Sequence, residues 1–170
     1  SFWVDACRPS DNADIRAMVE QHEGAESAGL IETWIQHPAT QTFVWRDENR
    51  KAVAFVLRID LDRLPPTETL ADPAMAALRQ YQQKNLTLRS GEQMALFRSW
   101  MSASSYQGVS PVQSSIFLNI VQHYFVPGLA ISGFCCAFPE FWKPFLAYGD
   151  LHHIPELDFQ SGDKPQGWFF

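Results

Sequence analysis

Hydrophobic and polar positions change period several times along this chain, and each change predicts a new element of secondary structure. An apolar run at 2–8 indicates a short strand that stops at a proline. Apolar residues then recur at helical spacing in 10–24 and again in 30–37. From 42 to 60 they alternate with polar or small residues, which predicts two strands joined by a turn at 47–50, the second strand having one well-defined apolar face.

The second half of the chain continues the alternation of strand and helix after a segment of different character. Residues 61–91 contain prolines and a short helix that starts at Asp72, and we expect this segment to be an insertion at the edge of the sheet. The later elements are predicted as a central strand at 94–101, a helix from Ser110, a strand at 129–137, an aromatic helix at 139–149, and strands at 151–160 and 166–170. The order β-α-α-β-β-(insert)-β-α-β-α-β-β predicts a single α/β or α+β domain over 1–170 with a mixed sheet.

Two helices in this half have distinct signals. Ser110 occupies an N-cap position, Pro111 follows at the first helical position, and Gln113 completes a capping box. The buried stripe of that helix is predicted to consist of Ile116, Phe117, Ile120, Val121 and Tyr124. In the later aromatic helix, Tyr148 is predicted to be a core residue with a solvated hydroxyl.

Composition narrows the class of protein. The 170 residues carry 13 Lys and Arg against 19 Asp and Glu, a net charge of −6, and 46% of them are apolar. This balance excludes a disordered chain and argues against nucleic acid as a partner. No apolar stretch reaches the ~18 residues that a membrane span needs, so a membrane is not expected as a partner either.

Three cysteines favour a reducing environment. Cys135 and Cys136 are adjacent and Cys7 leaves an odd number, so no disulfide framework is predicted. No second thiol pair or nearby His lies at zinc-ligand spacing, and no metal site is predicted. The interpretation is a cytoplasmic protein whose cysteines are small apolar residues within strands.

Three segments, taken in order, carry a resemblance to a known superfamily. Arg8–Ile15 is the end of a strand followed by the start of a first helix. Gln107–Val112 lies after the central strand, at the place of an R/Q-x-x-G-x-G/A loop, and Phe138–Gly149 is a closing helix followed by a final hairpin. In these features the chain resembles the GNAT superfamily of acyl-CoA N-acyltransferases over nearly its whole length, which implies a GNAT-like fold.

The resemblance implies an acyl-CoA-dependent N-acyltransferase that uses acetyl-CoA or another acyl-CoA. In this family two neighbouring parallel strands separate, the pantetheine arm pairs with the backbone of one of them, and the pyrophosphate rests on N–H groups at a helix N-terminus. The acceptor amine attacks directly, and a tyrosine often protonates the departing thiolate. The cofactor-binding residues that the resemblance implies are Trp100, Met101, Ser102, Gln107, Gly108, Val109, Ser110, Val112 and Gln113.

Departures from the family pattern leave two hypotheses open. Ser110 and Val112 occupy the two glycine positions of the loop, and Pro111 between them lacks an N–H. Phe145 stands where the family has its tyrosine, so Tyr148 is the remaining candidate proton donor. The chain is therefore either an N-acyltransferase or a non-catalytic, GNAT-derived ligand-sensing or docking domain. In the same way, the segment 110–113 is either an anion cradle or an ordinary helix cap.

The expected partners differ between these hypotheses. For an enzyme, the negative net charge favours a cationic amine acceptor, such as a polyamine, an aminoglycoside or a lysine side chain. Asp60, Glu92 and Glu140 are the carboxylates to consider as its general base. The run Tyr106–Ser114 resembles GNAT-type domains attached to P-loop ATPase modules in large bacterial proteins, and the chain begins at Ser1 rather than Met. Other domains of a larger protein are the partners that this second resemblance implies.

Overall fold

The structure is a computed structural model that describes residues 1–65, 68, 71–123 and 128–170; Tyr124, assigned above to a buried stripe, lies outside them. The strands are β1 (Trp3–Ala6), β2 (Thr40–Arg46), β3 (Ala52–Asp60), β4 (Gln93–Ser102), β5 (Leu129–Ala137), β6 (Phe159–Ser161) and β7 (Lys164–Phe169). The helices are α1 (Asn12–Glu23), α2 (Ala25–Ile35), α3 (Pro73–Asn85), α4 (Pro111–His123) and α5 (Pro139–Ala147). Among these helices, none has the length and apolar character needed to cross a bilayer.

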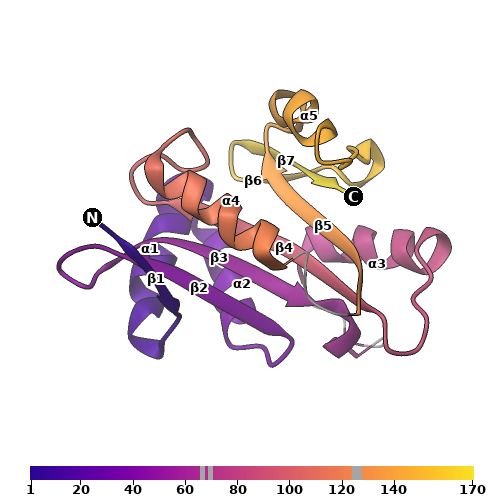
Figure 1. Cartoon of the computed structure of the whole chain (residues 1–170), viewed down its shortest axis with the longest axis horizontal. Helices are drawn as coiled ribbons and strands as arrows, with labels where there is room; N and C mark the ends of the chain where they lie inside the picture. Colours follow the sequence, from indigo (N-terminus) through magenta and orange to yellow (C-terminus); the bar gives the residue numbers. More distant parts are fainter. Residues whose placement is uncertain (66–67, 69–70, 124–127) are drawn as a thin grey trace.

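The strands form one seven-stranded mixed sheet in the order β1-β2-β3-β4-β5-β7-β6 (Figure 1). Neighbouring strands are antiparallel except β4 and β5, which are parallel. A parallel pair needs a crossover connection, and α4 lies in that connection. α1 and α2 pack on one face of the sheet, and α4 crosses the other. The predicted α+β order with a mixed sheet is confirmed.

The apolar residues of the central strands are divided between two cores, one on each face of the sheet. Along β3, Phe55, Leu57 and Ile59 belong to the core formed with α1 and α2. Ala54 and Val56, which alternate with them, belong to the core formed with α4. The prediction of one apolar face on this strand is therefore wrong, because helices cover both sides of the sheet.

Helix α3, from the segment 61–91, is built into the first of these cores. It begins after Asp72 as predicted, and the Asp72 carboxylate accepts a hydrogen bond from the N–H of Ala74 at 3.0 Å. Met75 and Leu78 are buried in the core that α1 and α2 share. The expected position at the edge of the sheet is wrong, because the helix joins two adjacent inner strands and has its own apolar side chains to bury.

The end of the chain contains less strand than its pattern predicts. Within 151–160, only Phe159 and Gln160 belong to a strand, since Pro155 starts a 3₁₀ turn. β7 lies inside the sheet between β5 and β6, and its Trp168 is fully buried.

The cysteines are buried or half-buried free thiols. Cys135 faces the core of α1 and α2, and Cys136 faces the core of α4. Burial raises the pKa of the Cys135 thiol to about 12 and that of the half-buried Cys7 thiol to about 11. These thiols are protonated near neutral pH and pack as small apolar groups.

Candidate functional site

The two parallel strands separate toward their carboxyl ends. β4 and β5 are paired over five residue pairs, the last of which joins Phe97 to Phe134. Beyond that point β4 remains paired with β3 and β5 with β7, and the register between β3 and β4 shifts at Arg58, which marks a bulge. A separation of this kind is what the family resemblance implies for the site of the pantetheine arm.

The side chain of Gln107 fills the space between the separated strands. Its Nε2 donates to Trp100 O of β4 at 3.2 Å, and its Oε1 accepts from the N–H of Ala137 of β5 at 2.9 Å. The indole of Trp100 adds a second link across the gap, from Nε1 to Cys135 O at 2.8 Å. Gln107 is 6% exposed and Trp100 is fully buried. Backbone groups that would face a bound molecule are therefore bonded to side chains of this chain.

Aromatic rings pack over the same gap. The ring centroid of Trp100 lies 5.2 Å from that of Phe117 on α4, 5.4 Å from that of Phe134 on β5, and 5.8 Å from that of Trp142 on α5. Ring pairs at these separations are stabilised beyond the burial of their surface. The gap is thus filled both by an amide and by a packed aromatic cluster.

The loop before α4 forms a helix cap. Ser110 Oγ accepts a hydrogen bond from the N–H of Gln113 at 3.1 Å, as predicted for an N-cap. The Gln113 side chain does not complete the capping box, because its Nε2 donates to Gln107 O at 2.7 Å. The N–H of Gly108 donates to a carbonyl of the preceding loop at 2.8 Å, and Pro111 has no N–H. Three donors that an anion cradle would use are therefore occupied or missing.

The other residues assigned to cofactor binding include both core positions and an exposed loop tip. Trp100, Met101 and Ser102 are buried in β4, and Met101 belongs to the core on the face away from α4. Val112, in the first turn of α4, is 8% exposed and belongs to the core between this helix and the sheet, whereas Val109 is 89% exposed.

Tyr148 lies at the surface, and the prediction of a core role for it is wrong. Its side chain is 95% exposed at the end of α5. The buried positions of this helix are Pro139, Trp142 and Leu146, and Tyr148 extends from a different side of the helix. Together with Phe145, it borders an apolar groove of about 300 Å³ between α4 and α5.

The three carboxylates considered as general bases lie apart. Asp60 Oδ1 accepts from Arg58 Nε at 2.8 Å, at the end of β3. Glu92 Oε2 accepts from the N–H of Arg89 at 2.8 Å in a turn, and the side chain of Glu140 is exposed on α5. Within the described ranges, no three His, Cys, Asp or Glu side chains come together in a way that could hold a metal ion.

A buried polar network that sequence reasoning missed lies on the other face of the sheet. Glu23, the last residue of α1, accepts from Ser27 Oγ at 2.7 Å and from the Tyr106 hydroxyl at 2.5 Å. Gln166 Nε2 donates to the same hydroxyl at 3.0 Å. Burial and the charge of Glu23 raise the pKa of Tyr106 well above its usual range. The only available signal was Glu23 before Gly24, a pattern that is also typical of an ordinary helix end.

Arg98 and Asp72 form an almost completely buried ion pair on that face. Arg98 Nε and Nη2 donate to the two carboxylate oxygens of Asp72 at 2.9 and 3.0 Å. Trp34 Nε1 donates to the same carboxylate at 2.8 Å. Because Arg98 follows the last residue of β4 that pairs with β5, this ion pair holds the separated part of β4 to α2 and α3.

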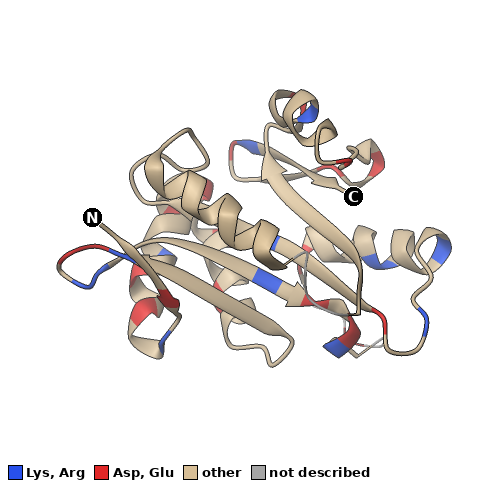
Figure 2. Ribbon diagram, in the orientation of Figure 1, with Lys and Arg blue, Asp and Glu red and all other residues tan. Residues whose placement is uncertain are grey.

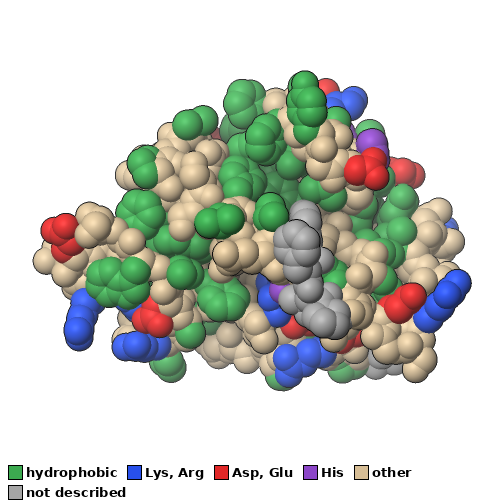
Figure 3. Space-filling view, viewed as in Figure 1, with side chains coloured by type: hydrophobic (Ala, Val, Ile, Leu, Met, Phe, Trp, Pro, Cys, Tyr) green, Lys and Arg blue, Asp and Glu red, His purple; other side chains and the backbone are tan. Residues whose placement is uncertain are grey.

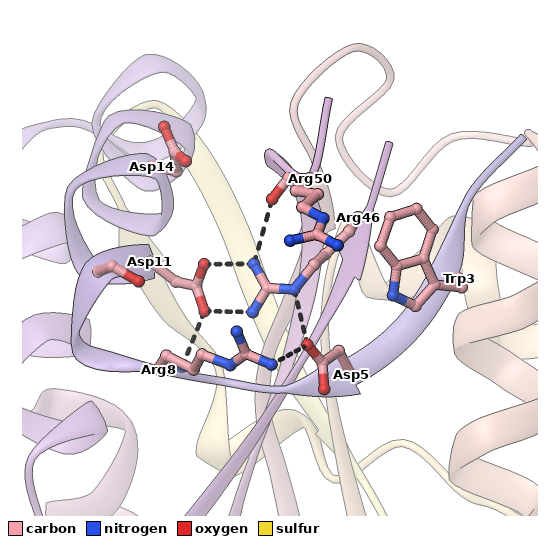
Figure 4. A pocket seen from close by; sticks show the side chains of 8 residues that line it. Trp3, Asp5, Arg8, Asp11, Asp14, Arg46 and Arg50 are labelled. Atoms are coloured by element: carbon pink, nitrogen blue, oxygen red, sulfur yellow. Dashed lines mark hydrogen bonds and ion pairs between the residues drawn. The ribbon is translucent and has the colours of Figure 1, made fainter. Parts of the chain in front are cut away.

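A polar pocket of about 480 Å³ lies beside β1 (Figure 4). Arg46 of β2 donates to Asp11 from Nη1 and Nη2 at 2.6 and 2.8 Å, and to Asp5 from Nε at 2.8 Å. Its two Nη groups also contact the carbonyl oxygens of Arg50 and Ala6. Every nitrogen of the guanidinium thus has a partner within the chain, and the cluster ties β1 and α1 to β2.

Stability is expected to depend on pH through Asp11 and Asp72. Hydrogen bonds from Arg46 hold the pKa of Asp11 below its usual range; burial alone would raise the pKa of Asp72, but the charge and hydrogen bonds of Arg98 lower it. Such groups contribute stability above their unfolded pKa of about 3.9, and the contribution is lost as pH falls through the folded pKa. We expect the free energy of urea unfolding to be level down to about pH 5 and to fall below about pH 4. A free energy of unfolding that does not change with pH down to below pH 4 would contradict this assignment. So would a pH dependence of that free energy in Asp72→Asn as steep as in the unaltered protein.

The sequence matches no protein-family model and no curated protein. Its fold is similar to solved structures. NAA60 of Arabidopsis thaliana in complex with acetyl-CoA matches with a TM-score of 0.65 and 7% identity, over 99% of this chain and 97% of that one. FeeM, an N-acyl amino acid synthase from uncultured soil microbes, matches with a TM-score of 0.61 and 13% identity, over 99% of this chain and 89% of that one. The spermidine/spermine N-acetyltransferase SpeG of Vibrio cholerae matches with a TM-score of 0.54 and 13% identity, over 99% of this chain and 93% of that one. The chain therefore has a GNAT-like α+β fold.

Proposed function

We propose that this chain is a non-catalytic, GNAT-derived domain whose own side chains occupy the place of an acyl-CoA pantetheine arm. The observation that carries the proposal is the Gln107 amide, which joins Trp100 O to the N–H of Ala137. A pantetheine amide has the same kind of donor and acceptor, so Gln107 supplies the bonds that the family resemblance assigns to the cofactor. The residues at this gap do not fit an acyl-CoA, and the domain would act by docking to other domains or by sensing another ligand.

An acyl-CoA would compete with groups that are already in place. Displacing Gln107 breaks two buried hydrogen bonds, and displacing Trp100 opens the aromatic cluster. A side chain keeps its place without the loss of translational and rotational freedom that a free ligand suffers on binding. The loop offers less compensation than the glycine-rich loop of the family, because the N–H groups of Gly108 and Gln113 are bonded and Pro111 has none.

The second candidate is an acyl-CoA-dependent N-acyltransferase. The separation of β4 and β5 beyond Phe97 favours it, and so does the similarity of the fold to an acetyl-CoA complex. In that case the backbone of 100–102 and the loop 107–113 would hold acetyl-CoA after Gln107 had left the gap. The acceptor would be the amine of a small molecule or of a lysine side chain, and Tyr148 remains the candidate proton donor.

Thermal unfolding with acetyl-CoA, CoA and longer acyl-CoAs separates the two candidates. We expect no shift of the melting temperature at millimolar ligand. A ligand at a hundredfold excess over its Kd stabilises the folded state by about 2.7 kcal/mol, which is roughly 5–10 °C for a chain of this size. A shift of that size in the unaltered protein would overturn the proposal and favour the enzyme; Ser110→Asp should then abolish the shift through charge repulsion.

The variant Gln107→Gly tests whether the side chain is what excludes the cofactor. We expect it to unfold at lower temperature, because Trp100 O and the N–H of Ala137 lose their partner at about 1–3 kcal/mol each, and to gain stabilisation by acetyl-CoA. The matched control is Gln113→Leu, which removes the neighbouring hydrogen bond to Gln107 O without emptying the gap and should gain none. If Gln107→Gly also fails to respond, the role assigned to this side chain is wrong.

A further inference from the structure

Helix α5 presents a row of exposed aromatic side chains. Phe141 and Phe145 of this helix are 71% and 57% exposed, and Tyr148, the helical C-cap residue, is 95% exposed. Their spacing of four and three residues is that of the a and d positions of a heptad, which line the seam between two packed helices. The α5 side chains Trp142 and Leu146, which are buried in the core, lie on a different side of the helix. Within the chain, Phe141 contacts Trp142, and Phe145 contacts Trp142 and Phe117, but most of the area of the row remains exposed.

A hollow lies beside this row on the same surface. The groove of about 300 Å³ between α4 and α5 is lined by Phe117, Ile120, Val121, Phe134, Phe145, Leu146, Tyr148, Gly149 and Leu151. Figure 3 shows hydrophobic side chains gathered over this part of the molecule, with charged groups toward its margins. The surface thus combines projecting rings with an apolar hollow, which lets one copy receive a ring from another.

We propose that this surface, the aromatic row of α5 with the adjoining groove, is the interface of a two-fold symmetric dimer of this chain. The midpoint between Phe141 and Tyr148 falls between Pro144 and Phe145. In an antiparallel pair of α5 helices about that point, Phe141 of each copy meets Tyr148 of the other. Symmetry then makes the contact identical in both directions and closes the assembly at two copies.

Charge and area agree with a second copy as the occupant. The row itself is uncharged, and of the two charged residues of α5, Glu140 and Lys143, Lys143 lies on the far side of the helix, so the two rows meet without like-charge repulsion although each chain carries −6 (Figure 2). With ~200 Å² per aromatic side chain, Phe141, Phe145 and Tyr148 expose roughly 450 Å². Leu118 and Val121 of α4, 59% and 45% exposed, extend the patch toward the roughly 600 Å² per partner of the smaller specific interfaces. We therefore expect a dimer with a Kd in the micromolar range.

Sedimentation velocity from low to several hundred micromolar protein tests the proposal. The mass should double across this range for the unaltered chain. Phe141→Glu and Tyr148→Glu should each stay monomeric, because a charge would be buried in the seam. The control is Val4→Glu. Val4 is an apolar residue of β1 that is 48% exposed and lies outside the proposed interface, so this variant should still dimerise.

Cross-linking tests the register separately. Pro144→Cys places a thiol next to the two-fold axis and should give a covalent dimer on mild oxidation, whereas Lys143→Cys, on the far side of the helix, should not. A monomer at all concentrations would overturn the proposal and leave this surface for a different chain, and equal cross-linking of both cysteine variants would overturn the antiparallel register. None of these outcomes depends on whether the domain binds acyl-CoA.

Discussion

Arg98→Met is expected to lower the free energy of unfolding by about 3–5 kcal/mol, the largest loss among the substitutions considered for this chain. Arg98 is 3% exposed and Asp72 is 1% exposed, and both carboxylate oxygens accept from the guanidinium. Without Arg98, the Asp72 charge stays in the core with only Trp34 and the first turn of α3 as donors. For a chain of 170 residues the loss corresponds to a drop in melting temperature on the order of 10 °C, measurable by calorimetry.

The matched control is the double variant Arg98→Met with Asp72→Asn. Asparagine keeps an oxygen that can accept from the N–H of Ala74 or from Trp34, but it carries no charge. We expect the double variant to recover most of the lost stability, because removing both members of a buried ion pair costs far less than removing one. If the double variant is as unstable as Arg98→Met, the loss comes from packing and not from an unpaired charge.

Arg46→Met is expected to cost about 3 kcal/mol, the second largest effect. The substitution leaves the Asp11 carboxylate, which is 3% exposed, without the guanidinium that donates to both of its oxygens. Without that cation, burial favours the protonated form of Asp11. The difference from the unaltered protein should therefore narrow as pH falls through the range in which Asp11 of the variant binds a proton while Asp11 of the unaltered chain, whose pKa Arg46 holds low, is still ionised.

Urea unfolding of Arg46→Met at neutral and acidic pH is the measurement. Arg8→Met serves as control, since Arg8 contacts Asp5 from the solvent side at 3.2 Å and an exposed ion pair contributes between zero and about 1 kcal/mol. Equal losses for the two arginines, or a difference that stays constant with pH, would show that Arg46 is not the cation that holds the Asp11 charge.

The sequence predicted the order of the elements because each has a local signal. The strand at 129–137 has the predicted bounds, and the helices after Asp72 and Ser110 begin where the caps indicated. Alternation of apolar with polar or small residues indicates a strand, but it does not reveal which elements cover the two faces of the sheet. For that reason the second, buried face of β3 and the position of α3 in the core were not predictable from local pattern.

The candidate site was predictable only in part. Gln107 was placed in the cofactor loop by its resemblance to a motif, but the direction of its side chain depends on contacts with Trp100 and Ala137, which are distant in sequence. The same holds for the bond between Glu23 and Tyr106, which are 83 residues apart. Tyr148 was misassigned because an aromatic residue at helical spacing fits a core and an exposed seam equally well.

The link across the sheet by Gln107 bears on how the domain persists in a cell. The two halves of the sheet, β1–β4 and β5–β7, share five backbone pairs at one end, and Gln107 and Trp100 join them at the other. A protein that relies on a metabolite to bridge such halves becomes easier to degrade when that metabolite is scarce. Here the bridge is encoded in the polypeptide, so under the proposed function we expect the lifetime of the domain not to depend on the supply of such a metabolite.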